Sequence, residues 1–415
     1  MSRPASSEAR AAVETVWRME SARIVGALAR YTGDVDLAED LAQEAVAEAL
    51  VSWAVGGVPV EPVGWLLTTG RRRAIDAFRR RGARDERYAL LARDLDEAGP
   101  GSDALFDPDA IEDDVLALMF TACHPLLAKE ARIALTLRLV GGLTTTEIAQ
   151  AFLVPVATIQ ARITRAKKTL SAARIPFAVP DAEERPARLG SVLQVVYLIF
   201  TEGSSATAGD DWMRTDLADE ARRLARGLVA LAPEPEVLAL LALLELTAAR
   251  FPARLGADGR AILLEDQDRR LWDRSAIRRG RAALAQAVSP RGLGAFGLQA
   301  SIAECHAVAP SVVETDWRRI VLLYEALGRL TPSPIIELNR AVAVAMATGP
   351  QDALALVEDL DARGELAGSH LLPAVRGELL ARLGRTADAR AEWTRALALC
   401  TNAAERTVLE EKIAR

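Results

Sequence analysis

The stretch EARIALTLRLVGGLTTTEIAQAFLVPVATIQARITRAKKTL, residues 130–170, predicts three helices with a tight turn before the last one. The tetrapeptide TTTE at 144–147 marks a helix start. A hydroxyl at the N-cap accepts a backbone N–H, and a Glu three residues later closes a capping box. Pro155 ends this short helix, because the residue before a proline is pushed out of the α region and proline suits the first turn of a new helix.

The last of these helices has one apolar stripe and a basic outer face. The stripe consists of Ile159, Ile163, Ala166 and Leu170, spaced at i, i+4, i+7 and i+11. The residues off the stripe are Thr158, Gln160, Ala161, Arg162, Arg165 and Lys168. A short helix, a tight turn and a basic second helix predict a helix-turn-helix whose second helix enters the major groove of DNA. The alternative is an ordinary amphipathic helix pair with a solvated basic face.

The length of 415 residues predicts roughly two to four domains. Composition predicts an all-α protein, because the chain is rich in Ala and Leu and poor in aromatic residues. The net charge of −6 is unevenly distributed. Residues 71–87 hold eight arginines and three acids, whereas residues 94–128 hold nine acids and no Lys or Arg. A basic segment, an acidic segment and a basic helix in this order imply local partners of opposite charge.

The cysteines and the apolar runs exclude several classes of protein. Cys123, Cys305 and Cys400 lie far apart without CxxC spacing, which argues against a disulfide framework and fits a reducing cytoplasm. Cys123 and Cys305 each precede a histidine, but neighbouring helical residues point about 100° apart, so we expect no metal and no other cofactor. The apolar runs are too short to span a bilayer and the polar start does not resemble a signal peptide, so no membrane partner is expected.

Residues 8–31 and 34–53 form two helices by pattern, separated by Gly33. In the second helix, acidic and amide side chains are expected to point outward over an apolar stripe. The stripe consists of Leu37, Leu41, Ala45 and Leu50. The outward residues are Asp36, Glu39, Asp40, Gln43, Glu44 and Glu48. Taken alone, this surface is better explained as a solvated acidic face, because charged faces usually just meet water.

A third helix begins at Pro62 and combines an aromatic residue with arginines. Trp65 is followed by four arginines away from the apolar positions: Arg71, Arg72, Arg79 and Arg80. A π-face for an unstacked base and cations for phosphates suit single-stranded DNA. Trp65 also suits a protein core, and the sequence does not separate these two roles.

Together these motifs resemble an extracytoplasmic-function (ECF) sigma factor of the sigma-70 family. The resemblance rests on D-x-A-E-D-x-x-Q-E, on P-x-x-W-L-x-x-x-x-R-x-x-x-x-D-x-x-R-R, and on L-T-x-x-E-I-A-x-x-F-x-V-x-x-x-T-I-x-x-R-x-x-R-A-x-x-x-L, in this order, with an acidic linker before the third motif. It covers about residues 8–174. One departure is Gly70-Arg71-Arg72, where the family usually has Ala-Arg-Asn, so phosphate contact is plausible for Arg72 and a base-edge role is in doubt.

The resemblance implies a cytoplasmic, non-enzymatic protein whose partners are core RNA polymerase, through its β′ clamp helices and β flap, and promoter DNA. It implies polymerase binding by Asp36, Asp40, Gln43 and Glu44. It implies melting of the minus 10 element by Trp65, Arg71, Arg72, Asp76, Arg79 and Arg80. It implies minus 35 recognition by Thr158, Gln160, Arg162, Arg165 and Lys168.

The same resemblance divides the chain into four parts. These are sigma region 2 at 1–88, an acidic linker at 89–108, sigma region 4 at 109–175, and a helical extension at 181–415. In the family the linker threads the RNA exit path of the polymerase, although a merely disordered, solvating linker explains this composition as well.

The extension is predicted to be helical throughout and to end in repeats. The predicted helices are 189–202, 217–231, 236–250, 262–288, 294–307, 317–330 and 335–347. Near the C terminus two segments align with Gly349 and Gly384 35 residues apart, a period that resembles tetratricopeptide (TPR) repeats. Such repeats form a groove for an extended peptide or a neighbouring domain, although a helical domain without any ligand fits the pattern too.

Two further segments, 197–203 and 265–273, resemble motifs of a sigma-factor subgroup that carries such an extension. The acids and arginines at 265–270 suit an ion-pair network between helices better than a catalytic carboxylate pair, since no nucleophile accompanies them. The sequence therefore predicts a sigma factor regulated in cis by its extension. The alternative is a DNA-binding regulator, or a ligand sensor or enzyme, with a helix-turn-helix head.

Overall fold

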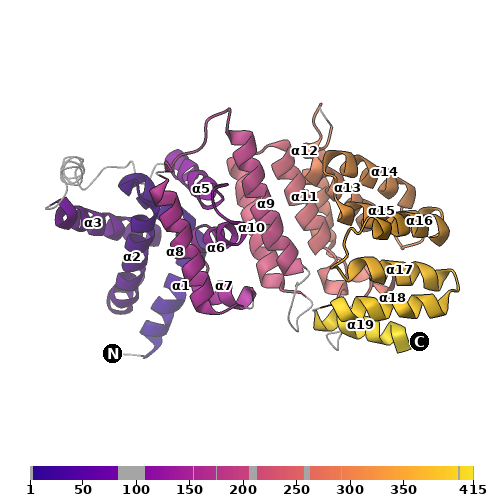
Figure 1. The fold of residues 1–415 in the computed structure, drawn as a ribbon. Coiled ribbons are helices and arrows are strands. Elements are labelled where there is room, and N and C mark those ends of the chain that lie inside the picture. The colour runs from indigo at the N-terminus through magenta and orange to yellow at the C-terminus, as the bar shows by residue number, and fades with distance from the viewer. Residues whose placement is uncertain are drawn as a thin grey trace. The chain divides into compact units, whose positions relative to one another are not determined.

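The computed structural model describes residues 3–82, 108–152, 154–173, 175–204, 213–256, 262–290, 292–400 and 402–414. The chain forms two compact units, Met1–Val196 and Tyr197–Arg415. Within the described ranges the regular elements are α-helices and short 3-10 turns, with no strand, as expected (Figure 1). None of the described helices combines the length and apolar character needed to cross a membrane. Apart from Pro108, the predicted linker at 89–108 lies outside the described residues.

The first unit begins with three helices, α1 (Arg3–Thr32), α2 (Val35–Gly56) and α3 (Pro62–Gly82). Asp34 caps α2, because its carboxylate accepts hydrogen bonds from the backbone N–H groups of Asp36 and Leu37. Helices α1 and α3 approach closely at Gly70, where an added Cβ would lie 2.9 Å from Cδ1 of Leu28. This crossing gives a physical reason for glycine at the position where the sigma family usually has alanine.

The helix-turn-helix is confirmed in the second half of this unit. The second half of this unit consists of α5 (Pro108–Ala122), α6 (Lys129–Leu139), α7 (Thr145–Ala151) and α8 (Val156–Ala172), of which α7 and α8 form the helix-turn-helix. The capping box forms as predicted: the N–H of Glu147 donates to Oγ1 of Thr144 over 3.1 Å, and the N–H of Thr144 donates to Oε2 of Glu147 over 2.7 Å. The buried residues of α8 are the predicted stripe of Ile159, Ile163, Ala166 and Leu170.

Helix α9 (Arg185–Ser204) begins in the first unit and ends in the second. Its first turns pack on the helix-turn-helix domain. Nη2 of Arg188 donates to the carbonyl of Phe120 over 3.0 Å, and Ser191 Oγ donates to the carbonyl of Cys123 over 2.6 Å. Arg132 on α6 donates to Ser191 Oγ over 2.8 Å. The start of α9 is therefore part of the same packed body as α5 and α6.

The second unit starts with four long helices joined in part by irregular segments. They are α10 (Thr215–Leu231), α11 (Pro235–Ala248), α12 (Arg274–Ala287) and α13 (Ala295–Val308). The helix predicted at 262–288 is wrong in its first half, because residues 264–266 and 269–271 form 3-10 turns and α12 starts only at Arg274. Asp273 fixes this start by accepting hydrogen bonds from the N–H groups of Ser275 and Ala276.

The chain ends in a stack of six helices. They are α14 (Trp317–Leu330), α15 (Pro334–Ala347), α16 (Pro350–Ala362), α17 (Leu371–Arg382), α18 (Thr386–Leu399) and α19 (Ala403–Ala414) (Figure 1). Gly349 and Gly384 have positive φ angles of 124° and 76° and precede α16 and α18, at the equivalent turns of the predicted repeat. A Cβ at Gly377 would lie 2.5 Å from Nε1 of Trp393, so this small residue permits the close crossing of α17 and α18.

Candidate functional site

The predicted acidic face lies on α2, with Asp36, Asp40 and Glu44 exposed and Gln43 half-buried. Burial, together with the carboxylates of Asp36, Glu39 and Glu44, raises the pKa of Asp40 above its ordinary value of 3.8, although Lys167 opposes this. One apolar position differs from the prediction, since Leu50 is 38% exposed, and Trp53 occupies the buried end of the stripe instead.

Glu39 was expected to point outward, and this prediction is wrong: the residue is only 6% exposed. Its carboxylate accepts a hydrogen bond from Nε of Arg138 over 2.6 Å and forms an ion pair with Nζ of Lys167 at 2.7 Å. Arg138 belongs to α6 and Lys167 to α8, so two helices of the helix-turn-helix domain close over the acidic helix. Two cations compensate the cost of burying this carboxylate.

Lys167 lies between the two predicted binding surfaces, and the sequence analysis did not single it out. Nζ of Lys167 also donates to Oδ1 of Asp36 over 2.6 Å. Burial lowers the pKa of Lys167, but the carboxylates of Glu39 and Asp36 outweigh burial and raise the pKa above 10.5, so the ammonium is charged at neutral pH. We define the charge latch as Asp36, Glu39, Arg138 and Lys167.

Helix α1 adds three polar contacts to the same helix-turn-helix domain. Nε1 of Trp17 donates to the carbonyl of Gly142 over 3.2 Å. Arg18 pairs with Glu147 at 2.6 Å, and Arg30 pairs with the buried Asp114 at 2.9 Å. Gly142 has a φ of 70°, and a Cβ there would lie 2.4 Å from Oγ of Ser21 on α1. The two domains of the first unit thus meet at a close, charge-rich interface.

The predicted melting residues lie along α3 in different environments. Trp65 is half-buried and meets Trp53 edge to face, with ring centroids 5.7 Å apart at 71°. Arg71 was expected to be presented outward, but it is 9% exposed, with its guanidinium 5.7 Å from the ring centroid of Tyr31. Arg72, Asp76 and Arg79 are exposed, and the side chain of Arg80 lies outside the described residues.

Arg73 connects α3 with the acidic face of α2. Its guanidinium pairs with Glu44 at 3.0 Å and with Glu48 at 2.7 Å. The hydrogen bonds that Arg73 donates to Glu48 and Glu44 raise the pKa of this arginine. Glu44 is therefore an exposed but already partnered member of the predicted polymerase-binding set.

The predicted recognition residues lie on α8. Gln160, Arg165 and Lys168 are exposed, whereas Thr158 and Arg162 are half-buried. Nε of Arg165 donates to the carbonyl of Ala161 over 3.1 Å, which holds this side chain along the helix. The structure brings one end of this helix to α2 through Lys167 and leaves the polar side chains near the turn on the outer face.

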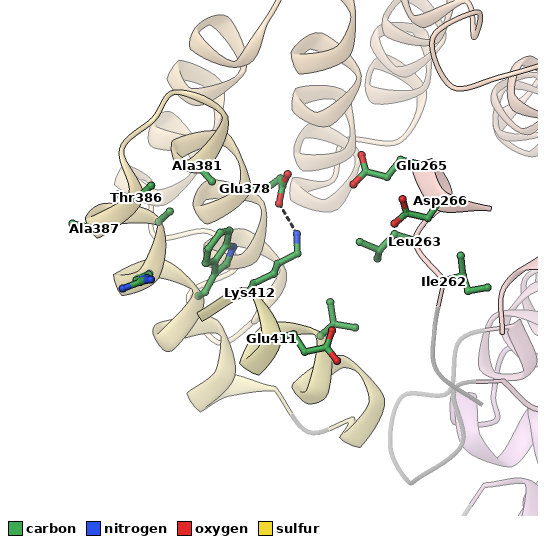
Figure 2. Close-up of a pocket in the computed structure, with 14 residues that line it drawn as sticks. Ile262, Leu263, Glu265, Asp266, Glu378, Ala381, Thr386, Ala387, Glu411 and Lys412 are labelled. Atoms are coloured by element: carbon green, nitrogen blue, oxygen red, sulfur yellow. Dashed lines mark hydrogen bonds and ion pairs between the residues drawn. The ribbon is translucent and has the colours of Figure 1, made fainter. Parts of the chain in front are cut away.

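The second unit contains a hollow of about 890 Å³ that is walled by α17, α18, α19 and the segment 262–266. Figure 2 shows Glu265 and Asp266 on one wall facing Glu378 and Lys412 on the opposite wall. Lys412 pairs with Glu378 at 2.5 Å, and Trp393 contributes an apolar surface. The lining of this hollow is therefore both polar and apolar.

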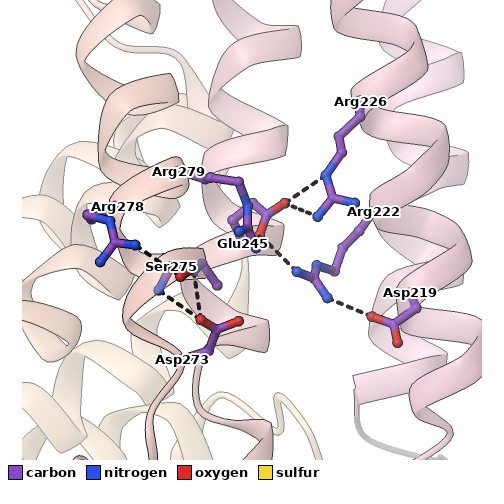
Figure 3. A network of polar contacts seen from close by, with 9 residues as sticks. Asp219, Arg222, Arg226, Glu245, Asp273, Ser275, Arg278 and Arg279 are labelled. Atoms are coloured by element: carbon purple, nitrogen blue, oxygen red, sulfur yellow. Dashed lines mark hydrogen bonds and ion pairs between the residues drawn. The ribbon is translucent and has the colours of Figure 1, made fainter.

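The second unit also holds a buried ion-pair hub. Glu245 on α11 is 1% exposed and pairs with Arg222 and Arg226 of α10 and with Arg279 of α12 (Figure 3). Burial raises the pKa of Glu245, but the hydrogen bonds from these arginines outweigh burial and hold the pKa below 4.5. An interhelical network was also expected at 265–270. There Asp268 pairs locally with Arg270, and Glu265 pairs with Arg382 of α17 at 3.4 Å.

Three family models match the chain. Sigma-70 region 2 matches residues 17–84, and Sigma-70, region 4, matches residues 117–170. A family of unknown function, DUF6596, matches residues 188–288, the segment that includes the hub around Glu245.

The chain is similar in sequence to two kinds of curated protein. An uncharacterized protein of Rhizobium meliloti (strain 1021) is 46% identical over 386 residues, which is 92% of this chain and 90% of that protein. A probable ECF RNA polymerase sigma factor, SigI, of Mycobacterium tuberculosis (strain CDC 1551 / Oshkosh) is 29% identical over 175 residues, 42% of this chain and 59% of that protein. No solved structure matches the chain.

Proposed function

This chain belongs to the sigma-70 family of RNA polymerase sigma factors, as an ECF-like member with a C-terminal extension, and we propose that the extension regulates its activity in cis. As a sigma factor the chain interacts with core RNA polymerase and promoter DNA and acts in transcription initiation. The direction of regulation and the contacts that carry it are the finer parts of the proposal.

The proposed polymerase surface is the acidic face of α2, with Asp36, Asp40, Gln43 and Glu44. An acidic face over an apolar stripe is complementary to basic clamp helices, for which we propose those of the β′ subunit. The helix-turn-helix domain would meet the β flap. For the DNA contacts we propose α3 at the minus 10 element and α8 at the minus 35 element. The predicted division at 1–88, 89–108, 109–175 and 181–415 is retained as part of this proposal.

The observation that carries the proposal is the charge latch. Lys167 of the proposed recognition helix holds Asp36 and Glu39 of the proposed polymerase-binding helix. A polymerase that contacted Asp36 would compete with Lys167 for the same carboxylate. We therefore propose that the described arrangement is a closed state, in which each surface partly covers the other.

We propose that the extension biases this closed state through α9. The first turns of α9 bind α5 and α6 through Arg188 and Ser191, and the same helix continues into the second unit. A displacement of α9 would therefore act directly on the body that carries Arg138 and Lys167. No separate anti-sigma partner is needed for such control. A peptide partner for the pocket between the segment 262–266 and helices α17 to α19 stays a prediction.

In vitro run-off transcription tests the proposal with full-length protein and with a chain that ends after Val196. This end point retains Arg188 and Ser191, whereas an end after Ala173 would also remove their contacts with α5 and α6. At matched folded concentration we expect promoter-dependent yields to differ by roughly tenfold, corresponding to a population shift of about 1–3 kcal/mol. Equal yields would show that the extension does not regulate in cis.

A further inference from the structure

Three helix ends of the C-terminal stack bring three potential metal ligands together. His370 is the N-cap residue of α17, Cys400 follows α18, and Glu405 lies in the first turn of α19. Nε2 of His370 lies 2.8 Å from Oε2 of Glu405, and the same oxygen lies 3.6 Å from Sγ of Cys400. One donor atom from each residue lies within 4.8 Å of those of the other two.

The polar atoms of this cluster contact one another and the backbone. Nε2 of His370 is buried and forms no hydrogen bond, although Glu405 Oε2 is at ion-pair distance. The thiol of Cys400 is buried, with the carbonyl of Asn402 3.6 Å from its sulfur. The three donor atoms are therefore close enough together to share one bound ion.

We propose that His370, Cys400 and Glu405 bind one zinc ion. Zn–S and Zn–N bonds are about 2.3 Å and 2.0 Å, so ligands of a tetrahedral site lie roughly 3–4 Å apart, close to the separations present here. An imidazole, a thiolate and a carboxylate suit zinc better than magnesium or calcium, which prefer oxygen ligands alone. The thiol loses its proton on binding, and the thiolate and carboxylate together balance the charge of the ion.

The electrostatics explain why the site would change on metal binding. Burial, aided by the carboxylate of Glu405, raises the pKa of the Cys400 thiol above 9.0. A divalent ion reverses this preference, because a coordinating thiol is deprotonated outright. The guanidinium of Arg406 lies nearby and donates to the carbonyls of Leu397 and Cys400 over 2.8 Å and 3.1 Å.

Metal binding would fix α19 against α17 and α18. Beyond Glu405 the same helix carries Val408, Glu411 and Lys412, which line the pocket of the second unit (Figure 2). Zinc occupancy would therefore set the position of one pocket wall. A regulatory consequence rests on the proposed function of the extension, whereas metal binding itself does not.

Cobalt(II) is the probe for the test, because a cobalt–thiolate bond gives a near-ultraviolet charge-transfer band and a tetrahedral site gives intense visible bands. Metal-free, reduced full-length protein should develop the charge-transfer band and the visible bands with one equivalent of cobalt. Zinc should displace the cobalt and remove these bands. Cys400→Ser should abolish the thiolate band, and Glu405→Gln and His370→Ala should weaken binding roughly tenfold or more. Cys305→Ser is the matched control, a buried cysteine beside a histidine in α13, and should keep the full signal.

Two results would overturn the proposal. One is the absence of a thiolate band in wild-type protein with excess cobalt, and the other is an undiminished band in folded Cys400→Ser protein. Circular dichroism establishes folding of each variant. If Cys400→Ser does not fold, the His370→Ala variant provides the test instead, because the half-exposed side chain of His370 lies at a helix start and its removal should be tolerated. Unchanged cobalt affinity in folded His370→Ala protein would also exclude the site.

Discussion

Removal of the Lys167 ammonium should release the proposed closed state. The side chain of Lys167 is 13% exposed and that of Glu39 is 7% exposed, so their pair is more strongly desolvated than surface pairs, which contribute about 0–1 kcal/mol. Breaking a buried pair costs about 3–5 kcal/mol where it leaves a lone charge, but here Glu39 keeps Arg138. We therefore expect Lys167→Ala to weaken the closed state by about 1–3 kcal/mol, a 5- to 150-fold shift toward the open state.

Binding to core RNA polymerase without DNA is the assay for this prediction. If only the open state binds, the apparent affinity rises with the open fraction until that fraction approaches one. Dyes on the outer faces of α2 and α8 report the separation of the two domains in the same samples. Lys168→Ala is the matched control, because it removes the same charge from the next residue, which is exposed, and it should change neither readout.

Unchanged polymerase affinity in Lys167→Ala, together with an unchanged distance between the domains, would refute the reasoning. A lower affinity would also refute it, since it would make Lys167 part of the polymerase surface. Salt gives an independent check, because screening should favour the open state in wild-type protein more than in Lys167→Ala.

Two further predictions concern the hub and the recognition helix. Glu245→Ala should lower the free energy of unfolding by about 3–5 kcal/mol in urea titrations, against less than about 1 kcal/mol for the exposed partner substitution Asp219→Ala. Because folding lowers the pKa of Glu245, the contribution of its charge to the free energy of unfolding is complete above about pH 4.5 and is lost as the pH falls through the folded-state pKa. Glu245→Gln should remove this part of the pH dependence of stability. Arg162→Ala should cost about 1–3 kcal/mol at one promoter position, whereas Lys168→Ala should weaken all DNA alike and flatten the salt dependence, both measured by titration of specific and random duplexes. Equal losses on both duplexes for both variants would contradict the assignment.

The helix-turn-helix could be predicted because its signals are local. The capping box at Thr144 and Glu147 depends on residues three apart, and the buried stripe from Ile159 to Leu170 depends only on helical period. Both features are confirmed. The irregular structure at 262–273 was harder to predict, because this segment contains good helix formers. Its turns are set by the capping side chains of Asp268 and Asp273.

The parts of the site that the sequence did not reveal are long-range charge contacts. Asp36 and Lys167 are 131 residues apart, and each looks like an ordinary solvated charge on its own helix. Glu39 follows the outward period of α2, and only the presence of Arg138 and Lys167 makes its burial favourable. His370 and Cys400 likewise fall in separate helix ends without a metal-binding spacing.

The distribution of ion pairs indicates where regulation would act. In the extension, Glu245 is held by arginines from both neighbouring helices and is almost fully buried, so opening that core would leave several charges unpaired. Between the two domains of the first unit, the pair of Arg18 and Glu147 is exposed and contributes little, Arg30 pairs with the buried Asp114, and the latch is the charged contact with α2. A signal of only 1–3 kcal/mol would therefore separate α2 from α8 before it deformed the hub. Under the proposed function, the latch at Lys167 is therefore the element whose equilibrium the extension would shift.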